Sequence, residues 1–181
     1  MRSSKKSNIE HLIEGCINNN RKSQKDLYER YFGLMMSISM RYCSDWDEAK
    51  EVVNTGFLKV FLKIKDYSGK GSFEGWMKRI IVNSALDYIK SLKQPTVEID
   101  DKNTYESDLY VDNEALNDFS VDDIIKHIQA LPPMSRAVFN MYVMEGYKHK
   151  DISKELGISE GTCHWHLQNA RKILQTKISK F

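Results

Sequence analysis

The side chains best suited to recognising another molecule lie in residues 147–174, on the outer face of two predicted helices. In the first helix Ile152 and Leu156 are four residues apart and share one face, and Gly157 can take the positive φ that often ends a helix. We expect Ser159 to cap the second helix through its hydroxyl group. The buried stripe of that helix repeats at steps of four, three and four, through Cys163, Leu167, Ala170 and Leu174.

The outward positions of the second helix hold hydrogen-bonding, aromatic and basic residues, with small residues near its start. They are Glu160, Gly161, His164, Trp165, Gln168, Arg171 and Lys172. A helix–turn–helix lays such a helix in the major groove, with side chains near its start at base edges and basic side chains at phosphates. An ordinary helical hairpin has the same spacing. The basic residues around the unit favour nucleic acid: Lys148, Lys150, Lys154, Arg171 and Lys172.

Residue types near the start of this helix also suit a metal ion. Cys163, His164 and His166 are close in sequence, and His149 precedes them. Neighbours on a helix project at different angles, however, and no C-x-x-C or H-E-x-x-H pattern accompanies them. No paired carboxylates and no Ser–His–Asp or Cys–His arrangement can be picked out. We therefore expect no catalytic residue, metal or cofactor.

The rest of the chain shows helical spacing as well, so the predicted fold class is all-α. The expected helices cover about 8–20, 24–42, 47–64, 72–92, 120–128 and 134–145. No apolar run approaches the roughly twenty residues that a membrane span requires, and no apolar segment follows the basic residues 1–7 as in a signal peptide. Cys16, Cys43 and Cys163 are an odd, scattered set, which we interpret as free thiols in a reducing cytoplasm.

Charge divides the chain into three blocks that its small net charge of +2 conceals. Residues 1–93 carry 17 Lys and Arg against 11 Asp and Glu, residues 94–123 carry 1 against 10, and residues 124–181 carry 9 against 4. Basic domains suit a polyanion, and an acidic block between them is typical of a solvated linker. We therefore predict two small helical domains, 1–93 and 120–181, joined by an acidic flexible linker at 94–119.

A loop containing two glycines, residues 65–72, precedes the last helix of the first domain. It lacks the spacing of a nucleotide-binding P-loop. In the helix that follows, basic residues and amides interleave with aromatic rings, which are the ingredients of single-strand binding. Phe73 and Trp76 are nevertheless more often core residues than base platforms, and we expect Trp76 in the core.

Five stretches carry a resemblance when they are taken in order: Leu27–Phe32, Asp47–Phe61, Phe73–Asp87, Leu131–Phe139 and Gly146–Leu174. They resemble motifs of the sigma factors of bacterial RNA polymerase, of the extracytoplasmic-function type, and the third is similar to F-x-x-W-L-x-x-I-A-x-N-x-x-x-D. The resemblance covers roughly residues 22–92 and 120–177. It implies a region-two domain followed by a region-four domain with a helix–turn–helix.

The resemblance also implies a function. The protein is expected to bind core RNA polymerase and to direct promoter-specific initiation of transcription, catalysing nothing itself. Its DNA partners would be the duplex promoter and the melted non-template strand, and an anti-sigma factor is expected from the family. We expect it in the cytoplasm, without membrane insertion. The acidic linker would either thread the polymerase cleft or only tether the domains.

Three groups of site residues follow. Duplex DNA is expected at Arg136, Lys148, Lys150, Thr162, His164, Trp165, Gln168, Arg171 and Lys172. The melted strand is expected at Tyr67, Lys70, Ser72, Lys78, Arg79, Asn83 and Asp87. The polymerase is expected at a dense charge cluster on the third helix: Asp45, Asp47, Glu48, Lys50, Glu51 and Asn54.

Some positions depart from the family pattern. Asn54 replaces a usual glutamine, and His164, Trp165 and His166 stand where small or basic residues are usual. The promoter sequence is therefore not inferred from better-known members. A regulator with a helix–turn–helix like that of response-regulator output domains is the alternative, and residues 24–92 argue against it because such a regulator needs no single-strand site.

Overall fold

The computed structural model of the chain describes residues 2–92 and 120–178, with side chains from residue 9 onward. Within these ranges the chain forms helices and turns and no strand, so the all-α prediction is confirmed. The chain contacts define two compact units, Met1–Ser39 with Trp46–Ala85 and Met40–Asp45 with Leu86–Phe181. The predicted domain limits at residues 93 and 120 remain a prediction, and the acidic segment 94–119 lies outside the described residues.

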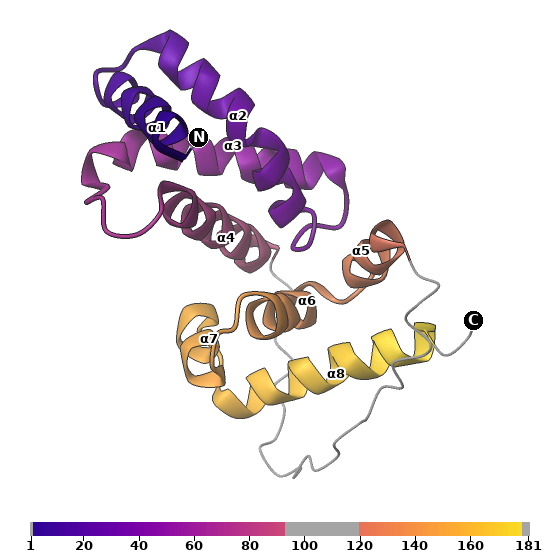
Figure 1. Cartoon of the computed structure of the whole chain (residues 1–181). Coiled ribbons are helices and arrows are strands. Elements are labelled where there is room, and N and C mark those ends of the chain that lie inside the picture. Colours follow the sequence, from indigo (N-terminus) through magenta and orange to yellow (C-terminus); the bar gives the residue numbers. More distant parts are fainter. Residues whose placement is uncertain (1, 93–119, 179–181) are drawn as a thin grey trace. The chain divides into compact units, whose positions relative to one another are not determined.

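The first unit is built from helices that pack around an apolar core (Figure 1). They are α1 (Arg2–Ile17), α2 (Arg21–Ser39), α3 (Trp46–Lys63), the short 3₁₀ helix η1 (Ile64–Asp66) and α4 (Phe73–Ser91). The core includes Leu27, Met35, Phe57, Met77 and Ile81. At Gly56 α3 comes so close to Ile81 of α4 that an added methyl group would collide with the isoleucine side chain.

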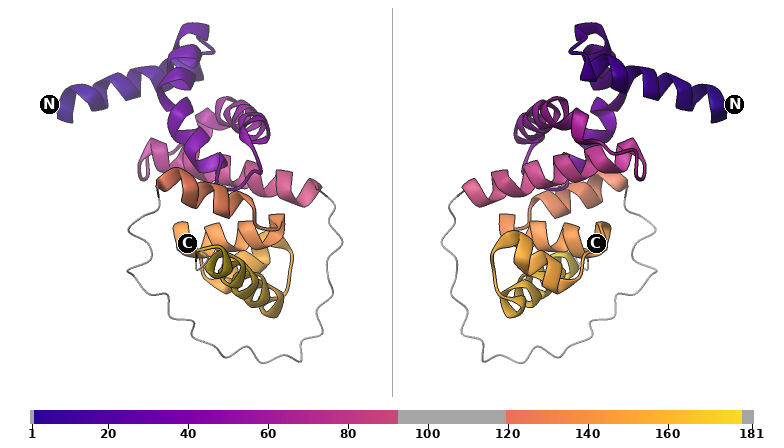
Figure 2. Two further views of the ribbon diagram at one scale, coloured as in Figure 1. Left: turned by 90° about the vertical axis from the view of Figure 1, so that its right-hand side faces the viewer. Right: turned by 90° about the vertical axis from the view of Figure 1, so that its left-hand side faces the viewer.

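The N-terminal helix differs from the prediction at both ends. It begins at Arg2 instead of residue 8, and it extends outward from the other helices of its unit (Figure 2). It was expected to reach about residue 20, with the next helix starting near residue 24, but it ends at Ile17 and only the residues from Asn18 to Asn20 are non-helical. Asn19 takes a positive φ of 55°. The Asn20 side chain accepts a hydrogen bond from Ser23 N at 3.0 Å and so caps α2, which begins at the next residue, Arg21.

The second unit contains α5 (Val121–Gln129), α6 (Pro133–Phe139), the π-helical turn η3 (Asn140–Met144), α7 (His149–Leu156) and α8 (Glu160–Ile178). Ser120 caps α5, because its hydroxyl oxygen accepts a hydrogen bond from Asp123 N at 3.2 Å. One helix was expected over residues 134–145, whereas the chain changes from α to π geometry at Asn140. Behind α8 lies a core that includes Ile128, Leu131, Met141, Ile152 and Leu167.

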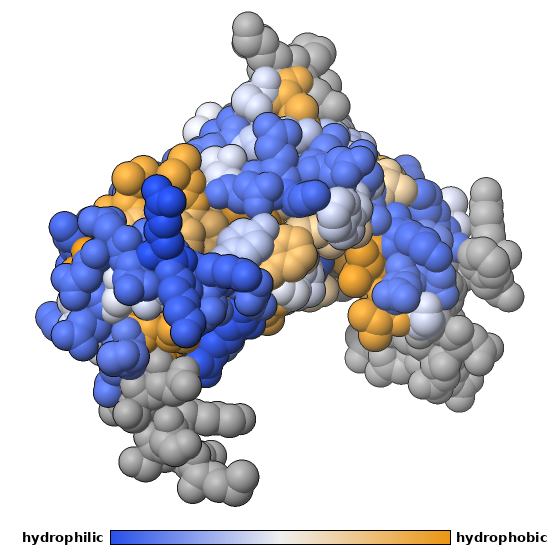
Figure 3. Space-filling model, turned by 90° about the horizontal axis from the view of Figure 1, so that it is seen from above, coloured by the Kyte–Doolittle hydropathy of each residue, from blue (hydrophilic) through white to orange (hydrophobic). Residues whose placement is uncertain are grey.

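The surface in Figure 3 is mainly hydrophilic, with hydrophobic side chains visible in separate places. None of the described helices combines the length and the apolar character that crossing a bilayer requires. The three cysteines are buried and free.

Candidate nucleic-acid and polymerase interfaces

Short-range hydrogen bonds build the turn between α7 and α8. Gly157 has a φ of 69°, which places it in the left-handed region, and its amide donates to Ser153 O. Ser159 then caps α8, since its hydroxyl oxygen accepts from Thr162 N at 3.0 Å. Both features were predicted and both are confirmed. They leave only Gly157, Ile158 and Ser159 between the helices, so α7 and α8 pack side by side (Figure 1).

The outer face of α8 carries most of the residues predicted to contact duplex DNA. Side chains on this face and at the start of α7 are well exposed at Lys148, Lys150, His164, Arg171 and Lys172, and half-buried at Thr162, Trp165 and Gln168. Thr162 is partly committed, because its hydroxyl lies 2.9 Å from the Ser159 hydroxyl in the cap. The longer side chains on this face remain available to enter a groove of duplex DNA.

One edge of α8 is occupied by a column of three rings, which we call the ring stack: Tyr142, His149 and His164. The ring centroids of His149 and His164 are 3.7 Å apart, and those of Tyr142 and His149 are 4.6 Å apart. His149 Nδ1 also lies 3.2 Å from Cys163 Sγ. Burial lowers the pKa of His149, and His164 and Arg171 lower it further, so His149 is a neutral ring at neutral pH.

The opposite edge of α8 is tied to α6 by a small polar cluster. Ser135 Oγ lies 3.0 Å from His166 Nδ1 and accepts a hydrogen bond from Asn169 Nδ2 at 3.3 Å. A hydroxyl group can donate to or accept from an imidazole nitrogen, so either tautomer of His166 fits this contact. Burial lowers the pKa of His166 to about 4. His166 is therefore a half-buried, neutral residue that packs against α6, and we leave it out of the duplex surface proposed below.

Arg136 lies in a different place from that expected of a phosphate contact. Its side chain is 1% exposed, and Nη1 donates to the carbonyl of Gln129 at 2.8 Å. Gln129 is the last residue of α5, where carbonyl groups lack partners within the helix. The guanidinium thus supplies a hydrogen-bond donor to the C-terminal end of α5, and we leave Arg136 out of the duplex surface proposed below.

In the first unit, the loop before α4 closes on itself. The Tyr67 hydroxyl donates to Gly71 O at 2.8 Å, and Gly69 and Gly71 have φ values of 74° and 85°. Ser72 caps α4, because its hydroxyl oxygen accepts from Gly75 N at 3.0 Å. The hydroxyl groups of Tyr67 and Ser72 therefore have partners within the loop and the helix.

Three aromatic rings meet where this loop joins α4. Phe73 and Trp76 stack with centroids 5.4 Å apart, and Tyr67 lies 5.1 Å from Phe73 and 5.5 Å from Trp76. Phe73 is buried, but Trp76 is only half-buried, so the prediction of a core tryptophan is wrong. The Trp76 ring covers Phe73 and Tyr67 and still presents surface to solvent.

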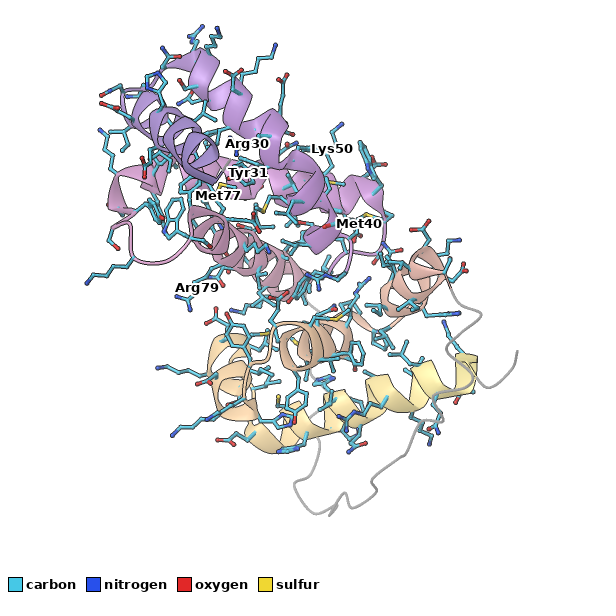
Figure 4. The ribbon with its side chains drawn as sticks, in the orientation of Figure 1. Arg30, Tyr31, Met40, Lys50, Met77 and Arg79 are labelled. Atoms are coloured by element: carbon cyan, nitrogen blue, oxygen red, sulfur yellow. The ribbon has the colours of Figure 1, made fainter. Side chains whose placement is uncertain are left out.

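The polar residues on α4 form an outward row. Arg79, Asn83 and Asp87 are exposed and follow at intervals of four, which places them on one face. Figure 4 shows Arg79 extending away from α4, whereas the buried Met77 lies toward Tyr31 of α2. Lys78 is half-buried and pairs with Glu74 at 3.0 Å. Lys70, in the loop, is exposed.

The charged end of α3 is accessible. Asp45, Asp47, Lys50, Glu51 and Asn54 are exposed, and Glu48 is half-buried. The amide oxygen of Asn54 accepts a hydrogen bond from the Tyr28 hydroxyl at 2.9 Å. Lys50 Nζ lies 4.8 Å from the centre of the Trp46 ring, which is 49% exposed.

Two leucines extend this face and were missed by the prediction. Leu58 and Leu62 are 60% and 72% exposed. With Glu51 and Asn54 they form one row along the outside of α3, at steps of three and four. A sequence signal existed, because both leucines fall outside the buried stripe of the helix. Exposed leucines one turn apart are a feature of a docking surface.

An ion-binding centre has no support in the described part of the chain. No group of three or more His, Cys, Asp or Glu there is arranged to hold a metal ion. The ring stack brings His149, Cys163 and His164 together, but as packed rings and a thiol contact.

Comparison with known families agrees with the two helical units. Residues 27–94 match the family model Sigma-70 region 2, and residues 122–174 match Sigma-70, region 4. These matches define a two-region transcription initiation factor. The chain belongs to the sigma-70 family, as a sigma factor of the extracytoplasmic-function (ECF) type, and the resemblance stated from the sequence is confirmed.

Individual relatives are distant but similar over most of their length. The ECF RNA polymerase sigma-E factor of Haemophilus influenzae is 24% identical over 177 residues, covering 92% of this chain and 93% of the relative. That of Escherichia coli is 22% identical over 180 residues, covering 92% of each. The fold is similar to that of Bartonella quintana RpoE, solved in complex with the anti-sigma factor NepR, with a TM-score of 0.51, 18% identity and coverage of 86% of this chain and 98% of that chain.

Proposed function

We propose that this sigma factor divides promoter recognition among three surfaces, which bind duplex DNA, melted DNA and core RNA polymerase. The duplex surface comprises Lys148, Lys150, Thr162, His164, Trp165, Gln168, Arg171 and Lys172. The strand surface comprises Tyr67, Lys70, Ser72, Lys78, Arg79, Asn83 and Asp87, with Trp76 added. The polymerase surface comprises Asp45, Asp47, Glu48, Lys50, Glu51 and Asn54, with Leu58 and Leu62 added.

The duplex surface reads the minus-thirty-five element. His164, Trp165 and Gln168 contact base edges, and the lysines and Arg171 contact phosphates. This assignment is supported by the capped start of α8, which leaves its first turns exposed opposite the buried stripe. A bidentate contact from an amide such as Gln168 discriminates between bases by about 1–3 kcal/mol, whereas phosphate contacts raise affinity for all sequences.

The strand surface captures an unstacked base of the minus-ten element. The exposed side of the Trp76 ring offers a flat apolar platform, and Asn83 can both donate to and accept from a base edge. Lys70 and Arg79 contact the phosphates of the melted strand. Stacking on an aromatic ring contributes about 1–3 kcal/mol per base, which offsets the cost of unstacking it from the duplex.

The polymerase surface combines acid with exposed apolar area. Asp47 and Glu51 attract a basic partner, and Leu58 and Leu62 bury apolar surface when that partner docks. A helix that served only the core of its own unit would not need two exposed leucines on its charged side.

The remaining parts of the proposal concern the setting in which the protein acts. The chain catalyses no reaction, and it works in the cytoplasm together with the polymerase. An anti-sigma factor holds it inactive, as supported by the solved relative bound to such a partner. Two domains, 1–93 and 120–181, are tethered by the acidic segment 94–119.

The observation that carries the proposal is the joint presence of regions two and four, each with an accessible polar face. It is tested with purified core RNA polymerase and DNA fragments randomised in two blocks at promoter spacing. Polymerase with the full chain should enrich fragments that share sequence in both blocks and initiate transcription on them. Polymerase alone should not. Enrichment of one block only, or binding without polymerase to paired half-sites, would favour an ordinary regulator and contradict the proposal.

A further inference from the structure

The ring stack joins three elements of the second unit at the edge of the duplex surface. Tyr142 belongs to η3, His149 is the first residue of α7, and His164 lies in the second turn of α8. Each ring meets the next at an interplanar angle of 24° or 30°. The column runs from the exposed Tyr142 over the half-buried His149 to the exposed His164, so two other elements of the unit contact a side chain on the DNA-facing helix.

An exposed histidine on a helix normally samples several rotamers. His164 instead lies against His149 with 3.7 Å between ring centroids, and this face-to-face contact restricts the plane of its ring. The edge of the His164 ring, which carries the nitrogen atoms, stays available because the side chain as a whole is exposed.

His149 is itself fixed from two further directions. Tyr142 covers its other face, and Cys163 Sγ lies 3.2 Å from Nδ1. Burial, and then Glu160, raise the pKa of Cys163 to about 11, so the thiol keeps its proton beside the ring. His149 is neutral for the reasons given above, and a neutral ring avoids charge repulsion with His164 and Arg171. The arrangement makes His149 a rigid flat support.

We propose that His149 is a positioning residue, which holds the His164 imidazole in one orientation so that His164 reads one base pair of the promoter duplex. The chemistry that fits is a purine edge, because an imidazole N–H can donate to the N7 atom of a purine or the O6 atom of guanine in the major groove. This inference rests on the proposed function of α8, and it adds a residue that does not face the DNA itself.

The test uses the full chain bound to core RNA polymerase, with DNA fragments randomised across the minus-thirty-five block. The variants are His164→Ala, which removes the reader, His149→Leu, which fills space without a planar polar ring, and His149→Phe, which restores a flat ring. Lys150→Ala is the control for a phosphate contact. Sequencing of the retained DNA gives the base preference at each position, and the helix content and thermal unfolding of each purified variant, compared with wild type by circular dichroism, show that it is folded.

Wild type should prefer a purine at one position that His164→Ala leaves unselected, a change of at least about fivefold in preference there. His149→Leu should lose most of the preference at that same position, and His149→Phe should recover it. Lys150→Ala should weaken binding evenly across the block. The inference is overturned if His149→Leu keeps the preference, if its loss is spread evenly over all positions, or if His149→Phe fails to recover it. Absence of any selection by wild type would instead contradict the proposed function.

Discussion

The duplex surface on α8 and the strand surface around α4 are built in different ways. The duplex surface lies mainly on one regular helix, α8, with Lys148 and Lys150 added from the start of α7. A buried stripe holds α8 from behind, and the ring stack and the Ser135 cluster hold its edges. The strand surface combines a loop with two positive-φ glycines, a half-buried tryptophan and one row of α4.

The difference matches the two forms of DNA. A duplex presents a groove of constant shape, so a reader gains from fixed side chains on a straight helix. An unpaired strand presents separate bases that must be stacked and enclosed, so rings and a tight loop suit it better. In both places the short hydroxyl side chains, Thr162 and Ser72, serve as internal hydrogen-bond partners, and the long side chains face outward.

The largest effect is expected where the two surfaces share a requirement, which is docking to polymerase. Glu51→Lys replaces an acidic side chain of the polymerase surface on α3 by a cation. Facing a basic partner, this change costs several kcal/mol, so retention on core polymerase should fall by about a hundredfold or more, and both DNA activities should fall together. Co-purification with core enzyme measures it. Lys63→Ala, on the same helix outside that surface, should be retained normally, and undiminished retention of Glu51→Lys would remove α3 from the docking surface.

Trp76→Ala should separate the two surfaces. Loss of the base platform costs about 1–3 kcal/mol, so open-complex formation should drop roughly 5- to 150-fold while protection of the minus-thirty-five block stays unchanged. Permanganate reactivity of melted thymines reports opening, and a footprint reports duplex binding. Trp76→Phe should keep most of the opening. Equal loss of protection at the minus-thirty-five block would show that Trp76 acts on the whole molecule.

Gln168→Ala should produce the opposite pattern. The preference at one base pair of the minus-thirty-five block should weaken by about 1–3 kcal/mol, and melting on an artificially opened promoter should be normal. Lys172→Ala is the matched control, one turn further along α8, and should lower affinity for every sequence without altering preference. If the two variants behave alike, Gln168 contacts phosphate and not a base.

The smallest effect is expected from lowering the pH, which should reduce the stability of the second unit. The pKa of His166 is 6.5 in an unfolded chain and about 4 in the folded unit, so below pH 6.5 the unfolded state binds a proton that the folded state does not. Stability should therefore be full above pH 6.5, fall as the pH drops toward 4 and level off below it. We expect a loss of roughly 1–2 kcal/mol, because the ring is partly exposed. The lowered pKa of His149 acts in the same direction.

Urea unfolding, followed by the fluorescence of a single tryptophan, can measure this loss of stability. A chain with Trp46→Phe and Trp76→Phe keeps Trp165 as the fluorophore of the second unit, and the complementary Trp165→Phe chain reports the first unit. His166→Asn should flatten most of the pH dependence seen by Trp165. A dependence of equal size in the first unit would point to a different group.

Much of the fold could be predicted because the signals are local. Gly157 and Ser159 define the turn of the helix–turn–helix, and Ser72 caps α4, through bonds to residues three or four positions away. The break after α1 and the change to π geometry at Asn140 were placed less well. The break is set by the local cap at Asn20, and neither that cap nor the change to π geometry can be read from the periodicity of apolar residues.

The same distinction between local and tertiary signals applies to the site residues. His164, Gln168 and Lys172 were placed outward by helical spacing alone, and they lie there. Arg136 and Trp76 were misplaced, since residue type favours the surface for arginine and the core for tryptophan. In the folded chain the carbonyl of Gln129 at the end of α5 accepts a hydrogen bond from Arg136, and Trp76 lies against the rings of Tyr67 and Phe73 while keeping part of its surface exposed.

The order of apolar stripes, caps and charged blocks along the chain was enough to determine two helical regions, a helix–turn–helix and a place in the sigma-70 family, because each of these depends on residues close together in sequence. Tertiary structure alone decided that His166 packs against Ser135 of α6, that Leu58 and Leu62 are exposed, and that Tyr142, His149 and His164 form one column. Those outcomes depend on contacts between helices distant in sequence, where burial is set by the neighbouring element and not by the residue itself.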